Sequence, residues 1–137
     1  MLNELGIYIH IPFCKQKCYY CDFVSYSNKC SEVKEYIESL KKEIEEFDFS
    51  NYKVTSIYIG GGTPSYIDSI YIVEILSELK EKLKCNLIEF KDIEITIEVN
   101  PGTVDTKKLN DYKKSGINRL SIGLQSTKND ILKKIGR

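Results

Sequence analysis

The segment Leu5–Cys21, which reads LGIYIHIPFCKQKCYYC, joins a strand-forming run to a cysteine motif. Isoleucine occupies every second position over Ile7–Ile11, and Tyr8 and His10 lie between. This period of two predicts a β-strand with one apolar and one polar face. The proline that follows has no N–H to donate to a sheet. We therefore expect the strand to cover Leu5–Ile11 and to lead directly into a cysteine-bearing loop.

Strand and helix patterns alternate along the rest of the chain. Short β-branched runs predict strands over Leu5–Ile11, Val54–Ile59, Ile93–Val99 and Asn118–Leu124. Apolar residues at helical spacing predict two long helices, one from Ser31 with Val33, Tyr36, Ile37, Leu40, Ile44 and Phe47, the other with Ile72, Val73, Ile75, Leu76, Leu79 and Leu83. Leu109 and Tyr112 mark a shorter helix that Gly116 can end in a left-handed cap. A last helix is expected to start near Thr127, with Asp130 as its capping partner.

This alternation predicts an α/β fold with parallel strands joined by right-handed crossovers. The whole chain, residues 1–137, is expected to form one domain, since no linker-like stretch divides it. About four βα units are few for a complete α/β barrel, which typically has about 250 residues. We therefore expect the N-terminal part of a barrel, incomplete at its C-terminal end. The apolar residues of the last strand, Leu120, Ile122 and Leu124, should then lack a covering strand or helix.

Unusual residues follow each predicted strand. The cysteine loop follows the first strand, Gly60–Gly62 follow the second, Glu98 and Asn100 end the third, and Gln125 closes the fourth. All carboxyl ends of parallel strands meet at one edge, where α/β folds place their ligands. The sequence therefore predicts a single site at this edge.

Composition excludes several classes of protein. The chain has 137 residues, of which 42% are hydrophobic and 29% charged, as in an ordinary globular domain. Twenty Lys and Arg offset twenty Asp and Glu, so no net field favours nucleic acid or an anionic membrane. No apolar run reaches the roughly 18 residues of a membrane helix, and residues 1–5 lack the features of a secretory signal. Five cysteines in such a chain favour a reducing compartment, and we expect a cytoplasmic protein.

Cys14, Cys18 and Cys21 have the spacing C-x3-C-x2-C. Three thiolates can hold three irons of a [4Fe–4S] cluster and leave the fourth iron open. The alternatives are zinc with an added ligand such as His10, or thiols with no metal at all. For His10, a hydrogen-bonded interior histidine is favoured over a ligand, whereas Tyr8, on the same strand face, can equally meet a ligand or pack in the core.

Other candidate groups are less specific. Gly60–Pro64 can offer backbone N–H groups to a carboxylate or can simply form a tight turn, and it matches neither the P-loop nor the dinucleotide fingerprint. Cys30 and Cys85 are expected to be buried thiols that behave as small apolar residues. A single histidine leaves few options for imidazole acid–base chemistry.

Taken together, these motifs resemble a known family. The cysteine spacing resembles the signature of radical S-adenosylmethionine (SAM) proteins. Four stretches, YIHIPFC (8–14), GGGTPS (60–65), EVNPGT (98–103) and NRLSIGLQS (118–126), resemble the oxygen-independent coproporphyrinogen III oxidase-like family, most closely its haem chaperone branch, HemW. The resemblance covers the whole chain and implies a partial TIM-type barrel.

The resemblance also implies roles for individual residues. Cys14, Cys18 and Cys21 would bind the cluster. The residues that match SAM contacts of the family are Tyr8, Tyr20, Gly61 and Glu98. Those that match a second SAM site of the oxidase are Gly62, Thr63, Gln125 and Arg137. For Gln125 and Arg137 the alternative is that they only stabilise the edge of the site.

One departure bears on function. The oxidase branch carries a further cysteine two residues after the third cluster ligand, where this chain has Phe23. The resemblance therefore favours a haem chaperone that binds and transfers haem, with an electron donor and a haem-acceptor protein as partners. An active porphyrinogen oxidase and a simple iron–sulfur or zinc module are the alternatives, so the choice between enzyme and carrier stays open.

Overall fold

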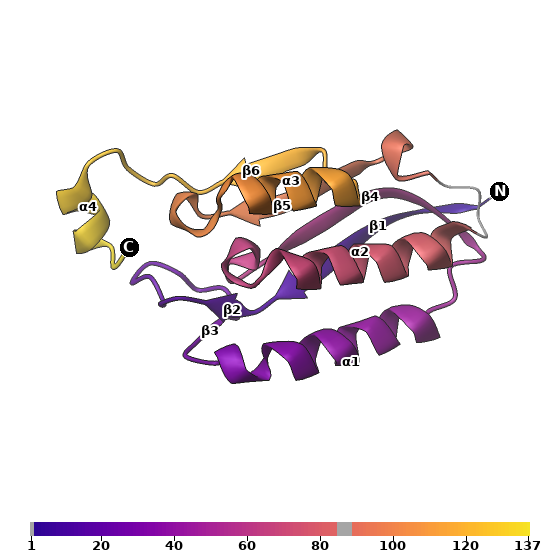
Figure 1. Ribbon diagram of the computed structural model, residues 1–137, viewed down its shortest axis with the longest axis horizontal. Coiled ribbons are helices and arrows are strands. Elements are labelled where there is room, and N and C mark those ends of the chain that lie inside the picture. The colour runs from indigo at the N-terminus through magenta and orange to yellow at the C-terminus, as the bar shows by residue number, and fades with distance from the viewer. Residues whose placement is uncertain (1, 85–88) are drawn as a thin grey trace.

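The computed structural model describes residues 2–84 and 89–137. Its main sheet has the spatial order β1 (Asn3–Ile11), β4 (Tyr52–Gly61), β5 (Glu94–Val99) and β6 (Arg119–Ile122), and every neighbouring pair is parallel (Figure 1). The predicted α/β architecture with parallel strands is thereby confirmed. Cys85 lies outside the described residues.

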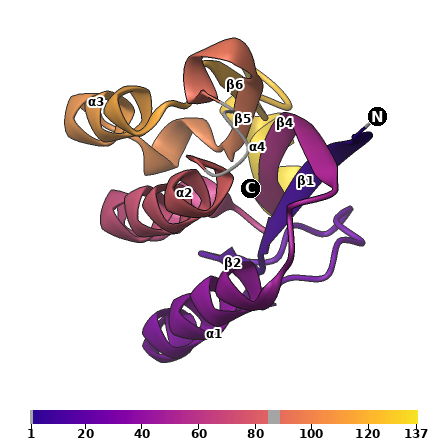
Figure 2. The ribbon, with the colours of Figure 1, turned by 90° about the vertical axis from the view of Figure 1, so that its right-hand side faces the viewer.

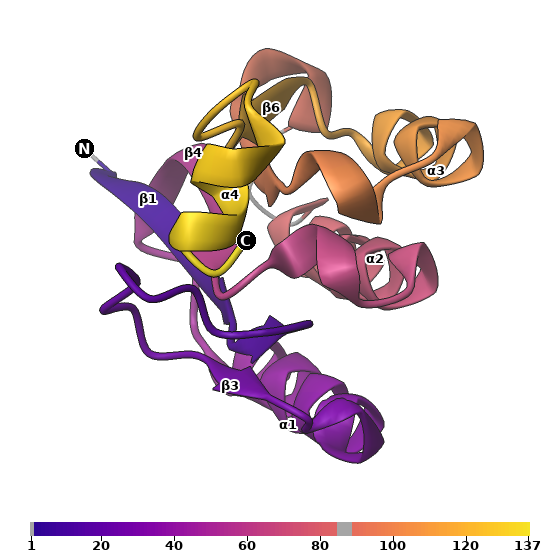
Figure 3. The same ribbon diagram turned by 90° about the vertical axis from the view of Figure 1, so that its left-hand side faces the viewer.

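Three helices cover one face of this sheet (Figure 2). They are α1 (Val33–Glu46), α2 (Ser69–Lys84) and α3 (Thr106–Ser115), and α2 packs between the other two. The short helix α4 (Asn129–Lys134) lies apart from them, beyond the carboxyl ends of the strands (Figure 3). As predicted, Gly116 ends α3 in a left-handed conformation, with a φ of 108°.

Short elements connect the larger ones. Single-turn 3-10 helices occur at Cys30–Glu32 (η1), Pro64–Tyr66 (η2), Phe90–Asp92 (η3) and Pro101–Thr103 (η4). Two two-residue strands, β2 (Phe13–Cys14) and β3 (Tyr26–Ser27), pair in parallel on either side of the cysteine loop. This pairing was not predicted, because two residues carry no detectable period.

The core lies between the sheet and the helices. Isoleucines on alternate positions of β1, β4 and β5 are buried against the helices: Ile9, Ile11, Ile57, Ile59, Ile95 and Ile97. From α2, Ile72, Ile75 and Leu79 are fully buried against them. Full burial of each such side chain contributes roughly 1.5–3 kcal/mol. The opposite face of the sheet carries polar side chains, so the strands show the alternation that the sequence predicted.

Several boundaries differ from the predicted ones. The strand β4 continues through Gly60 and Gly61, because both glycines pair with β1. The helix α1 ends at Glu46, and Phe47 instead packs against Phe49 at a ring distance of 4.6 Å. The prediction that Phe47 belongs to the buried helix face was wrong.

Two further predictions were wrong. The helix α4 begins at Asn129 without a side-chain cap, so Thr127 and Asp130 are not a capping pair there. Instead, the Ser126 hydroxyl accepts a hydrogen bond from the N–H of Lys128 at 3.1 Å. Cys30 is exposed and not buried, because it lies in the turn that precedes α1, where its thiol contacts the Tyr66 hydroxyl at 2.9 Å.

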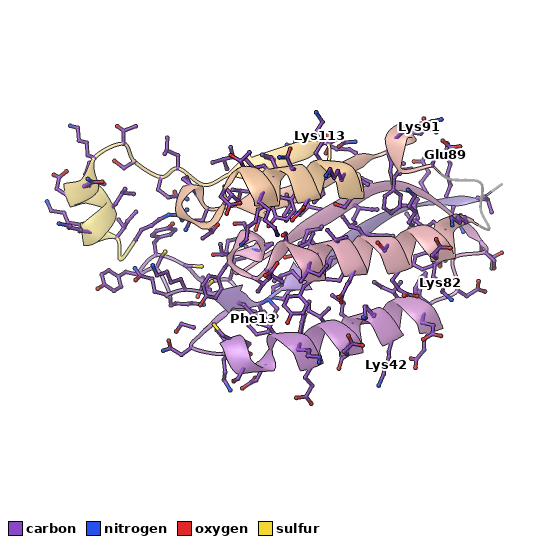
Figure 4. The ribbon with its side chains drawn as sticks, viewed as in Figure 1. Phe13, Lys42, Lys82, Glu89, Lys91 and Lys113 are labelled. Carbon is purple, nitrogen blue, oxygen red and sulfur yellow. The ribbon has the colours of Figure 1, made fainter. Side chains whose placement is uncertain are left out.

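The outer surface carries many charged side chains, but large apolar side chains are exposed in the segment after Cys18, such as Tyr19 and Phe23, and along the last strand. Lys42 on α1 and Lys113 on α3 are exposed, and Lys91 pairs with Glu89 at 2.6 Å (Figure 4). Along and after β6, the side chains of Leu120, Ile122 and Leu124 are 39%, 58% and 53% exposed, as the sequence predicted. Within the described ranges, no helix has the length and apolar character needed to cross a membrane.

Candidate functional site

A cavity of about 480 Å³ lies at the carboxyl ends of the strands. This volume is typical of a site for a small molecule or cofactor. Ten of the eleven predicted site residues line it: Cys14, Cys18, Tyr20, Cys21, Gly61, Gly62, Thr63, Glu98, Gln125 and Arg137. They come from the carboxyl ends of the main-sheet strands and from the segments that follow them, so the structure brings together residues that are far apart in the sequence.

The three cysteines enter the cavity from one short segment. Cys14 ends β2 and is buried, whereas Cys18 and Cys21 are partly exposed. The N–H of Cys21 donates to the carbonyl of Cys18 at 3.1 Å, which folds this segment into a turn. All three are free thiols and can ionise to become metal ligands.

The glycine loop fits closely around the cysteine segment. A Cβ atom added to Gly62 would lie 2.9 Å from the sulfur of Cys14, and one added to Gly61 would lie 2.8 Å from the ring of His10. Gly61 also has a φ of 121°, a conformation that other residues rarely adopt. A side chain at Gly62 would displace the cysteine segment and one at Gly61 would displace the end of β1, so the glycines are needed for close packing as well as for the turn.

The donor set bears on the choice between the metal alternatives. Within residues 2–84 and 89–137, no three His, Cys, Asp or Glu side chains converge as ligands of one ion. A [4Fe–4S] cluster makes a different demand, since each thiolate binds its own iron. Three unpaired thiols around one cavity fit the cluster better than a single zinc ion.

His10 does not supply a free metal ligand. Its Nε2 atom lies 2.9 Å from the carbonyl oxygen of Val24, which can only accept, so Nε2 carries the proton. Its Nδ1 atom accepts a hydrogen bond from the Tyr8 hydroxyl at 3.1 Å. Both ring nitrogens are therefore engaged, and the interpretation of His10 as a hydrogen-bonded structural histidine is the one that the geometry supports.

Glu98 is held in a fixed position at the end of β5. Its carboxylate accepts a hydrogen bond from the Tyr58 hydroxyl at 2.9 Å and another from the N–H of Gly61 at 3.2 Å. Burial raises the pKa of Tyr58, and the hydrogen bond to Glu98 raises it further. The phenol therefore stays protonated and continues to donate to the carboxylate.

Tyr8 is the predicted site residue that does not line the cavity. Its ring stacks on that of Tyr58 at 6.1 Å, and burial followed by the charge of Glu98 raises its pKa. Tyr58 itself was not among the site residues predicted from the sequence. The alternation over Val54–Ile59 could have placed it on the polar face of the sheet, beside Tyr8.

The end of the chain closes one side of the site. Arg137 donates to the Tyr20 hydroxyl at 2.9 Å and to the carbonyl of Gly123. The side chain of Gln16 donates to the carbonyl of Gly136 at 2.6 Å. Through these contacts, residues 135–137 fasten the cysteine segment to the end of β6. No sequence signal indicated them.

Comparisons with known proteins agree with this geometry. The family model of the radical SAM superfamily matches residues 8–137. Two relatives named heme chaperone HemW, from Buchnera aphidicola subsp. Schizaphis graminum and from Escherichia coli, are 48% identical over 140 residues and 40% identical over 141 residues. Each match covers 99% of this chain and 36% of the relative, so the chain spans about a third of the length of these relatives.

A solved structure also matches the chain. Coproporphyrinogen III oxidase (HemN) from Escherichia coli, described as a radical SAM enzyme, matches with a TM-score of 0.87 at 29% identity. The match covers 99% of this chain and 31% of that one, so the parallel sheet is the N-terminal portion of the same fold. Because the family model also accounts for nearly the whole sequence, the chain belongs to the radical SAM superfamily.

Proposed function

We propose that the cavity holds a [4Fe–4S] cluster and SAM, and that the chain forms the cofactor-binding part of a HemW-like haem chaperone. The observation that carries this proposal is the meeting of three free thiols, the glycine loop and Glu98 around one cavity of about 480 Å³. When bound, the cluster and SAM together supply one-electron chemistry that side chains cannot perform. The chain itself binds, orients and shields them.

Each group in the cavity has a task that suits its chemistry. Cys14, Cys18 and Cys21 supply one thiolate to each of three irons, which leaves the fourth iron open to SAM. Glu98 is a fixed carboxylate acceptor and suits the ribose hydroxyl groups of SAM. Its bond from Gly61 ties this acceptor to the glycine loop.

A second SAM molecule would use a different set of cavity residues. Gly62, Thr63 and Gln125 line the same cavity and are its proposed contacts. The guanidinium of Arg137, however, is engaged by Tyr20 and Gly123. These contacts favour the alternative role for Arg137, which is to stabilise the edge of the site.

Two observations favour haem transfer over porphyrinogen oxidation. Phe23 stands where the oxidase branch carries a further cysteine, and the relatives with the higher identity are named heme chaperones. We therefore propose haem as cargo, with an electron donor and a haem-acceptor protein as partners. Free thiols that hold a cluster require a reducing compartment, which fits a cytoplasmic location.

The test is to reconstitute the chain with iron and sulfide under anaerobic conditions and then to add haem or coproporphyrinogen III. We expect about four irons per chain, from the cluster type, SAM binding by calorimetry, a haem absorption band that saturates, and no decarboxylated porphyrin. Decarboxylated product would instead establish the oxidase. A colourless protein that binds zinc would contradict both proposals. The matched control is Cys30→Ala, which leaves the three cavity thiols intact.

A further inference from the structure

Lys108 lies behind the site and fastens two of its loops together. From the first turn of α3, its ammonium group donates to the carbonyl oxygens of Ser65 at 2.7 Å, Ile67 at 2.8 Å and Thr103 at 3.2 Å. All three of its N–H donors are thereby used. Ser65 and Ile67 belong to the segment after the glycine loop, and Thr103 belongs to the segment after β5. Lys108 itself does not line the cavity.

A second set of bonds joins the same two segments. The hydroxyl of Ser65, which is completely buried, accepts from the backbone N–H of Asn100 at 3.1 Å and is hydrogen-bonded to the hydroxyl of Thr103. The hydroxyl of Thr103 also lies 2.7 Å from the carbonyl of Asn100. Asn100 and Thr103 line the cavity, and so do Gly61–Thr63.

The environment of Lys108 is unusual for a lysine. No carboxylate among the described residues forms an ion pair with its ammonium, which donates to three backbone carbonyls instead. Burial lowers its pKa, although the nearby charges of Asp68 and Asp105 act in the opposite direction. A surface lysine is normally solvated and makes no such set of bonds. A half-buried cation that gives all its donors to two loops is therefore suited to fixing how those loops lie.

The structure assigns to Lys108 a positioning role: it holds the glycine loop and the end of β5 at the spacing that SAM requires. This inference rests on the proposed function, because it takes SAM as the ligand of the cavity. Glu98 sits on β5 and bonds to Gly61, so the distance between the two segments sets where this carboxylate lies relative to the cysteines. Lys108 acts through these groups and not by contact with the cofactor.

The experiment compares Lys108→Met with the wild type in the anaerobically reconstituted chain. We expect unchanged iron content, about tenfold weaker SAM binding by calorimetry, and faster hydrogen exchange in residues 60–66 and 100–103. Lys108→Arg keeps the charge and several donors and should recover part of the affinity. Lys107→Met is the matched control, because Lys107 is exposed and pairs with Asp111 at 3.4 Å, so both readouts should stay as in the wild type.

Two results would overturn the inference. One is a folded Lys108→Met chain that binds SAM with wild-type affinity, and the other is a chain whose two loops exchange no faster than before. If Lys108→Met fails to fold, Ser65→Ala removes the second set of bonds and is judged by the same two measurements. If the wild type binds no SAM, the proposed function fails and the role of Lys108 toward SAM fails with it, whereas hydrogen exchange separately measures whether Lys108 fixes the two loops.

Discussion

The helix-covered face of the sheet and the carboxyl ends of its strands use different residues for different purposes. The covered face is packed with isoleucine and leucine, and side chains such as Ile59, Ile97 and Leu79 are fully buried. The carboxyl ends carry glycine, cysteine and polar side chains around an open cavity. The first region supplies most of the free energy of folding. The second is less closely packed and leaves a cavity that a ligand can enter. Substitutions in the first region should therefore change stability, and those in the second should change ligand binding.

The largest effect is expected from Cys18→Ala at the carboxyl ends of the strands. Removal of one of three thiolates should abolish the visible chromophore of the reconstituted chain, because a cluster with one ligand fewer is not retained. The chain should still fold, since Cys18 is partly exposed and contributes little to the core. Visible absorbance and iron analysis measure the loss of the cluster. Cys30→Ala should keep the chromophore, and iron retained at about four per chain in Cys18→Ala would refute the assignment.

The opposite pattern is expected from Leu79→Ala on the covered face. Removal of this fully buried side chain leaves a cavity in the core and should lower the free energy of unfolding by about 2–5 kcal/mol. The protein that remains folded should bind iron as before. Denaturant titration followed by circular dichroism checks the change. Leu109→Ala, at a position that is 38% exposed, is the control and should lower the free energy of unfolding much less. Equal losses of stability in the two variants would mean that Leu79 is not part of the core.

A smaller effect, confined to the cofactor, is expected from Glu98→Ala. The carboxylate is proposed to accept hydrogen bonds from SAM, and a loss of such bonds should weaken binding about tenfold. The iron content should not change. Glu94→Ala is a matched control, because Glu94 lies on the same strand but pairs with Arg119 at 2.9 Å, away from the cavity. Equal SAM affinities in the wild type and Glu98→Ala would leave Glu98 a purely structural role.

The smallest effect is expected at β6, the strand at the uncovered edge of the sheet. Its free edge and the 58% exposed side chain of Ile122 should cause concentration-dependent self-association. Ile122→Lys should shift the association severalfold toward monomer in size-exclusion chromatography, because a charge disfavours edge pairing. Ile70→Lys, at a 52% exposed position on α2, should leave the association unchanged. A wild-type monomer that melts cooperatively above about 55 °C would show that the four βα units suffice on their own.

The sequence by itself determined the order of the elements and most of the site. A strand alternates with a period of two and a helix with a period near 3.6, so local patterns located all four main strands and their covering helices. The parallel order then required the cysteines, Gly61 and Glu98 to meet at one edge. These conclusions need only local patterns and the topology that follows from them.

Only the tertiary structure decided how that edge is held together. The contact between Arg137 and Tyr20 joins residues 117 positions apart, and the three carbonyls that Lys108 binds come from two different crossover segments. The exposure of Cys30 likewise depends on where the turn before α1 lies against Tyr66. None of these contacts leaves a periodic signal in the sequence, because each depends on the relative placement of loops after the sheet and helices have packed.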